Sequence, residues 1–204
     1  MSTVRPLRPP PPEPLELHAR AMDNLRYIRE TMERAGSFTA LSGWSQVLIG
    51  VTAIVAAWFA SRQTDPTAWV AVWTVEALCA AAIGGLGTAL KAQRAGVPLL
   101  SGPGRKFVLG LAPALLTGGI LTVVLFRTGA PGLLPGVWLL LFGVGLLGAG
   151  AVSVRIVPLM GLCFMTVGTL ALVTPAHWGD AWMAVGFGGL NLVFGALIAR
   201  RYGG

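Results

Sequence analysis

Glu76 is the only acidic residue inside a long apolar stretch of this sequence, so its carboxyl is the clearest candidate for chemistry. It lies about 12 Å along a helix that begins near Ala68, where it shares a face with Trp69, Trp73 and Gly87. Carboxyl groups at such depth in lipid are costly and usually face a bundle interior or an aqueous cavity. Glu76 could therefore carry a proton, bind a cation or act as a counter-ion. The alternative is a protonated or hydrogen-bonded structural carboxyl near the outer interface.

Gln46 and Asn191 are the other strongly polar side chains that fall within apolar stretches. Either of them could line a path through the bundle together with Glu76. The competing interpretation is that they form hydrogen bonds between helices, which is the more common role of amides in such positions.

Other chemistry finds little support in the sequence, which has no pattern typical of an enzyme, a nucleotide site or a zinc site. His177 and Asp180 are too few ligands for a metal ion. His18 and His177 are expected on opposite sides of a membrane, which argues against a haem held by two histidines. Cys79 and Cys163 lie in apolar stretches, as free thiols commonly do. We therefore expect no enzyme activity and no catalytic, cofactor-binding or metal-binding residues.

The elements that position these residues follow from the composition, which is 54% hydrophobic and only 11% charged. A soluble domain carries about 25% charge, and a helix needs about 20 apolar residues to cross a bilayer. The chain contains six such runs, which predict an all-α bundle of six transmembrane helices over residues 38–199, surrounded by lipid. The runs are Phe38–Ala60, Ala68–Leu90, Phe107–Phe126, Leu133–Val152, Ile156–Val173 and Ala181–Ala199.

The positions of the basic residues predict the orientation, because lysine and arginine accumulate in cytoplasmic segments. With the N-terminus inside, 13 of the 15 basic residues are cytoplasmic, and only Arg62 and Arg127 lie outside. We therefore expect both termini, including a short tail at 200–204, to lie in the cytoplasm. Because the basic residues are spread between apolar runs, we expect no binding of nucleic acid.

The segment before the first run divides into two parts. Residues 1–14 form a basic, proline-rich tail that we expect to be disordered. Residues 15–36 show a helical period of apolar residues and predict an amphipathic cytoplasmic helix. Such a helix could lie on the membrane surface, pair with a second copy of itself, or pack on the inner end of the bundle.

A Pro-x-x-Trp pattern recurs at the outer start of each returning helix, at Pro66–Trp69, Pro135–Trp138 and Pro175–Trp178. Proline starts a helix without losing a needed donor, and tryptophan anchors the membrane interface. Glycine follows in each of these helices and permits close packing. The six spans could thus be three related hairpins, although chance is a real competitor. The expected interface anchors are Trp69, Trp73, Trp138, Trp178 and Trp182.

The stretch Arg29–Trp44 reads RETMERAGSFTALSGW. It resembles the start of a group of uncharacterised bacterial inner-membrane proteins, in which a short charged helix leads into Phe-Thr-Ala-x-Ser-Gly-Trp and the first span. The resemblance covers only the beginning of the chain. It implies a bacterial inner membrane and several spans, but it implies no activity and transfers no functional residue.

Two functions from different classes fit these observations. The first is a structural or regulatory scaffold, or a subunit of a membrane complex, with a protein partner or a homo-oligomer as its assembly. The alternative is a small transporter or channel that uses Glu76 in its path. The surroundings of Glu76 discriminate between them, because a transporter requires a water-accessible cavity that continues toward Gln46 or Asn191.

Overall fold

The computed structural model describes residues 22–28, 42–94, 102–150 and 153–202. The chain divides into two units, Met1–Gly36 and Ser37–Gly204. In the first unit, residues 22–28 are helical, within the stretch predicted to form an amphipathic helix. The predicted tail at 1–14 and most of the stretch Arg29–Trp44 lie outside the described residues.

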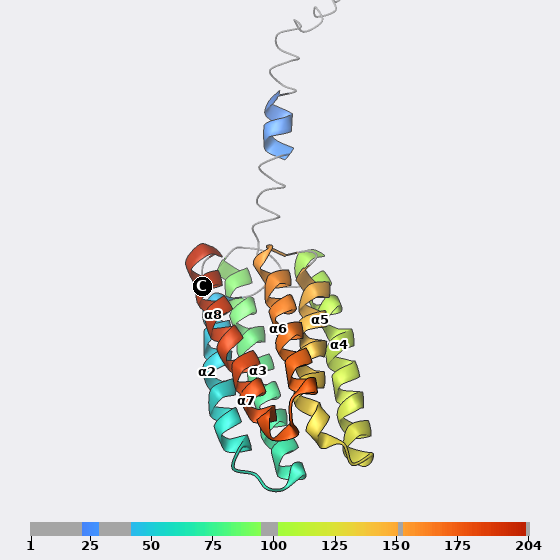
Figure 1. Ribbon diagram of the computed structural model, residues 1–204. Coiled ribbons are helices and arrows are strands. Elements are labelled where there is room, and N and C mark those ends of the chain that lie inside the picture. The colour runs from blue at the N-terminus through green and yellow to red at the C-terminus, as the bar shows by residue number, and fades with distance from the viewer. Residues whose placement is uncertain (1–21, 29–41, 95–101, 151–152, 203–204) are drawn as a thin grey trace, which may run out of the picture. The chain divides into compact units, whose positions relative to one another are not determined.

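The second unit is built from helices and short turns, and its described residues include no strand, which confirms the all-α prediction (Figure 1). Six segments of the described residues are long and apolar enough to cross a membrane, which confirms the six predicted spans. The first five contain α2 (Gly43–Ala60), α3 (Pro66–Arg94), α4 (Gly102–Arg127), α5 (Leu134–Gly150) and α6 (Ile156–Val173). The sixth span, Ala176–Tyr202, combines η2 (Ala176–Trp178), α7 (Gly179–Met183), η3 (Ala184–Leu190) and α8 (Asn191–Tyr202).

Local capping explains where two of these helices begin and end. The carboxylate of Asp65 accepts hydrogen bonds from the backbone N–H groups of Thr67, at 3.3 Å, and Ala68, at 3.1 Å. Pro66 then occupies the first turn, where its missing N–H costs nothing, so α3 begins two residues before the predicted start. Gly129 closes α4 in the left-handed conformation, at φ +73°, that glycine adopts most easily.

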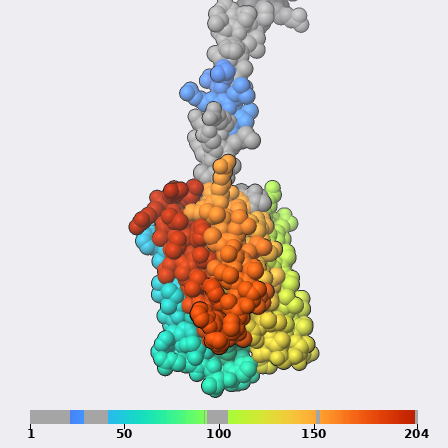
Figure 2. Space-filling model, in the orientation of Figure 1, coloured from blue at the N-terminus to red at the C-terminus, as the bar shows by residue number. Residues whose placement is uncertain are grey.

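The helices pack in a continuous series. The first hairpin pairs α3 with α2, and α2 packs on the sixth span. The sixth span contacts α6, which packs on α5, and α5 packs on α4 (Figure 1). Figure 2 shows α8 and α6 together on one face of the molecule. The outermost members of the series, α3 and α4, bury far less of their surface than α2 and α5 do.

Glycine allows the closest of these contacts, as the sequence predicted. A Cβ atom added to Gly143 of α5 would lie 2.7 Å from the carbonyl oxygen of Gly161 in α6. A Cβ added to Gly195 of α8 would lie 2.7 Å from the backbone nitrogen of Val47 in α2. Backbones therefore touch at both helix pairs, which only small residues permit.

The sixth span contains a π-helical segment, η3, that the sequence did not predict. A π-helix widens the backbone ring by one residue, and such segments occur frequently at functional sites. Phe187 lies within η3 and joins an aromatic cluster, with ring centroids 5.2 Å from Phe142 and 5.4 Å from Phe164. The wider turn therefore lies beside the most densely packed aromatic part of the core.

The two ends of the bundle differ in composition. The turns at 61–65, 128–130 and 174–178 lie at one end, called here the Trp-rich end. The opposite end, called here the basic end, carries seven of the nine lysine and arginine residues that the structure describes within 42–202. The basic end includes Lys91, Arg105, Lys106, Arg155, Arg200 and Arg201.

Candidate functional site

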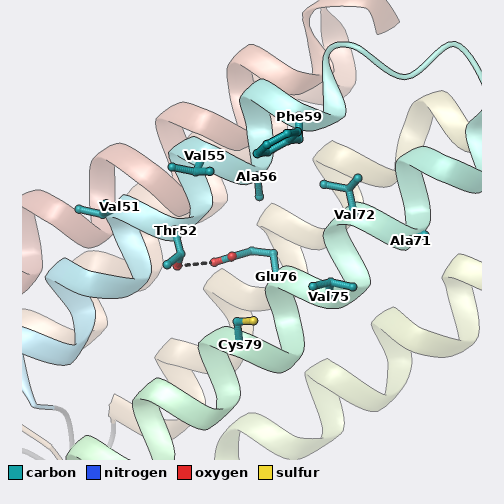
Figure 3. Close-up of a pocket in the computed structure, with 10 residues that line it drawn as sticks. All are labelled: Val51, Thr52, Val55, Ala56, Phe59, Ala71, Val72, Val75, Glu76 and Cys79. Carbon is teal, nitrogen blue, oxygen red and sulfur yellow. Dashed lines mark hydrogen bonds between the residues drawn. The ribbon is translucent and has the colours of Figure 1, made fainter.

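Glu76 lies in a groove between α2 and α3 (Figure 3). The groove has a volume of about 560 Å³ and opens on the outer surface of the bundle. Apart from Glu76, Thr52 and Cys79, its lining is hydrocarbon. We call this feature the Glu76 groove, and its lining residues are Val51, Thr52, Val55, Ala56, Phe59, Ala71, Val72, Val75, Glu76 and Cys79.

One hydrogen bond fixes the carboxyl of Glu76. The Oγ1 atom of Thr52, on the facing helix, lies 2.9 Å from Glu76 Oε1 and 3.0 Å from the carbonyl oxygen of Ile49. A threonine hydroxyl has one proton and cannot donate to both oxygens at once. A protonated Glu76 could donate to Thr52 and leave the threonine proton for Ile49, whereas an ionised Glu76 would accept that proton itself. In both states the second carboxyl oxygen has no hydrogen-bond partner in the described part of the chain.

The Thr52–Glu76 hydrogen bond should contribute measurably to stability. We expect a double-mutant cycle of Thr52→Val and Glu76→Leu to give a coupling energy of about 0.6 to 1.7 kcal/mol, as found for hydrogen bonds between transmembrane helices. The measurement is equilibrium unfolding in mixed detergent micelles. Thr117→Val is the matched control, because its hydroxyl bonds only to Pro113 O of its own helix. The effects of Glu76→Leu and Thr117→Val on the free energy of unfolding should be additive. An equal coupling energy in the two cycles would show that the Thr52–Glu76 contact does not stabilise the bundle.

Gln46 and Asn191 lie elsewhere, and neither lines the Glu76 groove. Gln46 is buried on the face of α2 that meets α8, and its Cβ atom fills the space beside Gly195. The amide nitrogen of Asn191 donates to the carbonyl oxygen of Phe187 over 2.8 Å, within the sixth span. The Oδ1 atom of Asn191 is buried without a hydrogen-bond partner. The structure therefore does not connect the three polar residues that the sequence suggested as one path.

The tryptophans of the Trp-rich end are held by specific hydrogen bonds. The indole N–H of Trp69 donates to Asp180 over 2.7 Å, and that of Trp138 donates to Thr122 over 2.9 Å. Trp182 likewise donates to Thr174, over 2.7 Å. In the second and third hairpins, the returning helix is thus tied to the preceding helix by an indole. That regularity agrees with the suggested repeat but does not test it.

Two predicted anchors differ from the rest in their surroundings. Trp178 is half exposed, as an interface anchor should be. Trp73 is buried, and its ring lies 6.4 Å from that of Phe187, so it belongs to the core and not to the surface. Trp58 was not among the predicted anchors, although it is exposed on α2 with the guanidinium of Arg62 4.7 Å from its ring centroid.

A second recess, of about 210 Å³, lies among the turns of the Trp-rich end. Pro66 and Pro135 both line it, so the starts of two returning helices meet there. Its two carboxylates already have partners, because Asp65 caps α3 and Asp180 accepts from Trp69. The Trp69–Asp180 bond joins the first and third hairpins there, whereas the bonds of Asp65 stay within the start of α3.

Metal and thiol chemistry find no further support within the described ranges. No group of three or more His, Cys, Asp or Glu side chains there could hold a metal ion. Both cysteines are free, and Cys79 is exposed in the Glu76 groove.

The six apolar helices make this chain a multi-pass α-helical membrane protein. No family model, curated protein or solved structure matches the chain. The Glu76 groove and the packing around it are therefore the features of this chain that bear on its function.

Proposed function

We propose that the chain is a structural or regulatory subunit of a membrane complex. One observation carries this proposal: the carboxyl of Glu76, within a membrane-spanning helix, lies in an apolar groove on the outside of the bundle and is hydrogen-bonded to Thr52. Polar groups on the outside of a membrane bundle are costly in lipid, and they commonly contact other helices.

The location of the other polar groups favours this proposal over transport. A carrier or channel needs polar groups that line a continuous path. Gln46 and Asn191 lie on the packed side of α2 and within the sixth span, apart from the Glu76 groove. The interior between these helices is filled by backbone contacts at Gly50, Gly143 and Gly195.

We further propose that the complex belongs to a bacterial inner membrane, with both termini of this chain in the cytoplasm. The resemblance at Arg29–Trp44 supports the compartment. The distribution of basic residues supports the orientation, because Lys91, Arg105 and Arg200 share one end of the bundle, while tryptophan hydrogen bonds dominate the other.

Two measurements on the full chain test this function. In proteoliposomes with a pH gradient, wild type and Glu76→Gln should both leak protons no faster than protein-free liposomes do. Particles extracted from native membranes in polymer discs should have a mass above that of one chain with its lipids. Proton flux in wild type that is lost in Glu76→Gln would establish transport instead, and particles that contain a single chain would rule out a subunit role.

A further inference from the structure

We propose that the Glu76 groove binds a transmembrane helix of a different protein, which carries a lysine or arginine in the middle of the membrane. This inference rests on the proposed function and specifies the partner of the same site. Three features of the described residues support it: the shape of the groove, the charge at its centre, and the absence of a matching cation at that depth in this chain.

The shape of the groove suits a helix. Its walls are the ridges Val51, Val55 and Phe59 of α2 and the ridge Val72, Val75 and Cys79 of α3, spaced by three and four residues. Each ridge runs about 12 Å along its helix. Helices pack when the ridge of one enters the groove formed by another, so a third helix can lie between α2 and α3.

The surface beside the groove is uncovered and apolar. Val75 is 60% exposed and Val55 is 50% exposed, although both lie in the membrane-spanning part of the bundle. Further along α3, a Cβ atom added to Gly85 would meet nothing within 4 Å. Among the described elements α3 packs mainly on α2, and the exposed side chains of Val75 and Leu78 leave one face open to a neighbour.

The carboxyl of Glu76, at the centre of the groove, determines which side chain a bound helix should carry. Glu76 follows Pro66 by ten residues, which places it about 15 Å from the start of α3 and near the middle of a hydrocarbon core about 30 Å thick. A carboxylate at that depth is costly unless a cation pairs with it. Lipid headgroups lie at the membrane surfaces, so a cation at mid-depth must be carried by a helix that spans the membrane.

The described spans of a second copy do not supply that cation. The basic side chains of the described spans lie at helix ends, as with Lys91, Arg127 and Arg200. Lys91 follows Glu76 by fifteen residues, which is about 22 Å along α3. The partner is therefore a different protein with a basic residue in its membrane span.

Cys79 gives a direct test, because it lies in the groove about one turn from Glu76 and is exposed (Figure 3). The full chain, carrying Cys163→Ser, is placed in liposomes with a synthetic Leu-Ala transmembrane peptide. The peptide has one central lysine and a cysteine one turn away, and the control peptide has leucine in place of the lysine. When copper phenanthroline is added as the oxidant, we expect the lysine peptide to form about tenfold more disulfide with Cys79 than the leucine peptide does. Glu76→Gln should remove that difference.

Two variants control for access and folding. In Cys79→Ser with Leu116→Cys, the thiol moves to a 69%-exposed site on α4, where both peptides should react equally. Val75→Trp fills the groove but keeps the Thr52–Glu76 contact, and it should lower reaction with the lysine peptide to the level of the leucine peptide.

Other occupants have their own outcomes. If both peptides reacted equally with Cys79, the groove would not select a basic helix and lipid would be its occupant. That result would overturn the proposal. A Cys79–Cys79 disulfide in liposomes without peptide would show that the groove binds a second copy. Binding of tetraphenylphosphonium that is lost in Glu76→Gln, without discrimination between the peptides, would make the groove a site for small lipophilic cations. In each case the mass of the native particle still tests separately whether the chain is a subunit.

Discussion

Replacing Gly143 with alanine should lower the free energy of unfolding of the bundle by about 2 kcal/mol, within the usual cost of overpacking a core. The new Cβ atom would lie 2.7 Å from the carbonyl oxygen of Gly161 and 2.9 Å from the backbone nitrogen of Met165. Both atoms belong to the backbone of α6, so no side-chain rotation can make room. Relief requires α5 and α6 to move apart, which weakens the dispersion contacts along their whole interface.

Gly119→Ala is the matched control for this effect. Gly119 lies within α4, and a Cβ atom added there would meet nothing within 4 Å. Alanine is a better helix former than glycine by about 1 kcal/mol in water, so Gly119→Ala should be neutral or slightly stabilising. Unfolding by sodium dodecyl sulfate in mixed micelles, followed by tryptophan fluorescence, measures both variants. If Gly143→Ala were as stable as Gly119→Ala, the α5–α6 contact would not be as close as described.

The spans were predictable because lipid imposes a simple pattern on the sequence. The fifth span was predicted at Ile156–Val173, and α6 has those bounds, since Arg155 and Pro175 limit the apolar run on both sides. By contrast, α3, α4 and α8 extend beyond their apolar runs. Backbone hydrogen bonding continues through charged residues, so α3 reaches Arg94 and α8 reaches Tyr202. Hydropathy therefore predicts where a helix crosses the membrane, but it does not predict the residue at which the helix ends.

The candidate site was only half predictable. The sequence identified Glu76 as a candidate, but the pattern of residues on one face of a helix does not predict which neighbouring helix that face contacts. Glu76 and Trp73 are three residues apart and differ by about 60° around the helix. That angle is enough for Trp73 to enter the core beside Phe187 while Glu76 faces Thr52 on α2. The Trp69–Asp180 bond was missed because it joins residues that are far apart in the chain, and no residue pattern pointed to the π-helical segment η3.

Labelling of single cysteines should show one orientation in the membrane. Gln63 and Gln93 are a matched pair, because both are exposed and they lie near opposite ends of α3. With Cys79→Ser and Cys163→Ser as background, Gln63→Cys should react with a membrane-impermeant maleimide on intact cells. Gln93→Cys should react only after the cells are permeabilised. The effect is all-or-none, because a thiol on the inner side is beyond the reach of the reagent.

The physical basis of that result is the placement of charge. Thirteen of the 15 basic residues lie on the predicted inner side, and cytoplasmic retention of lysine and arginine sets the orientation of short loops. The reverse labelling pattern would place all 13 on the outer side and would contradict this assignment. Partial labelling of both variants on intact cells would mean that two orientations coexist. Coexistence requires nearly equal basic charge on the two sides, so a distribution of 13 to 2 predicts a single population.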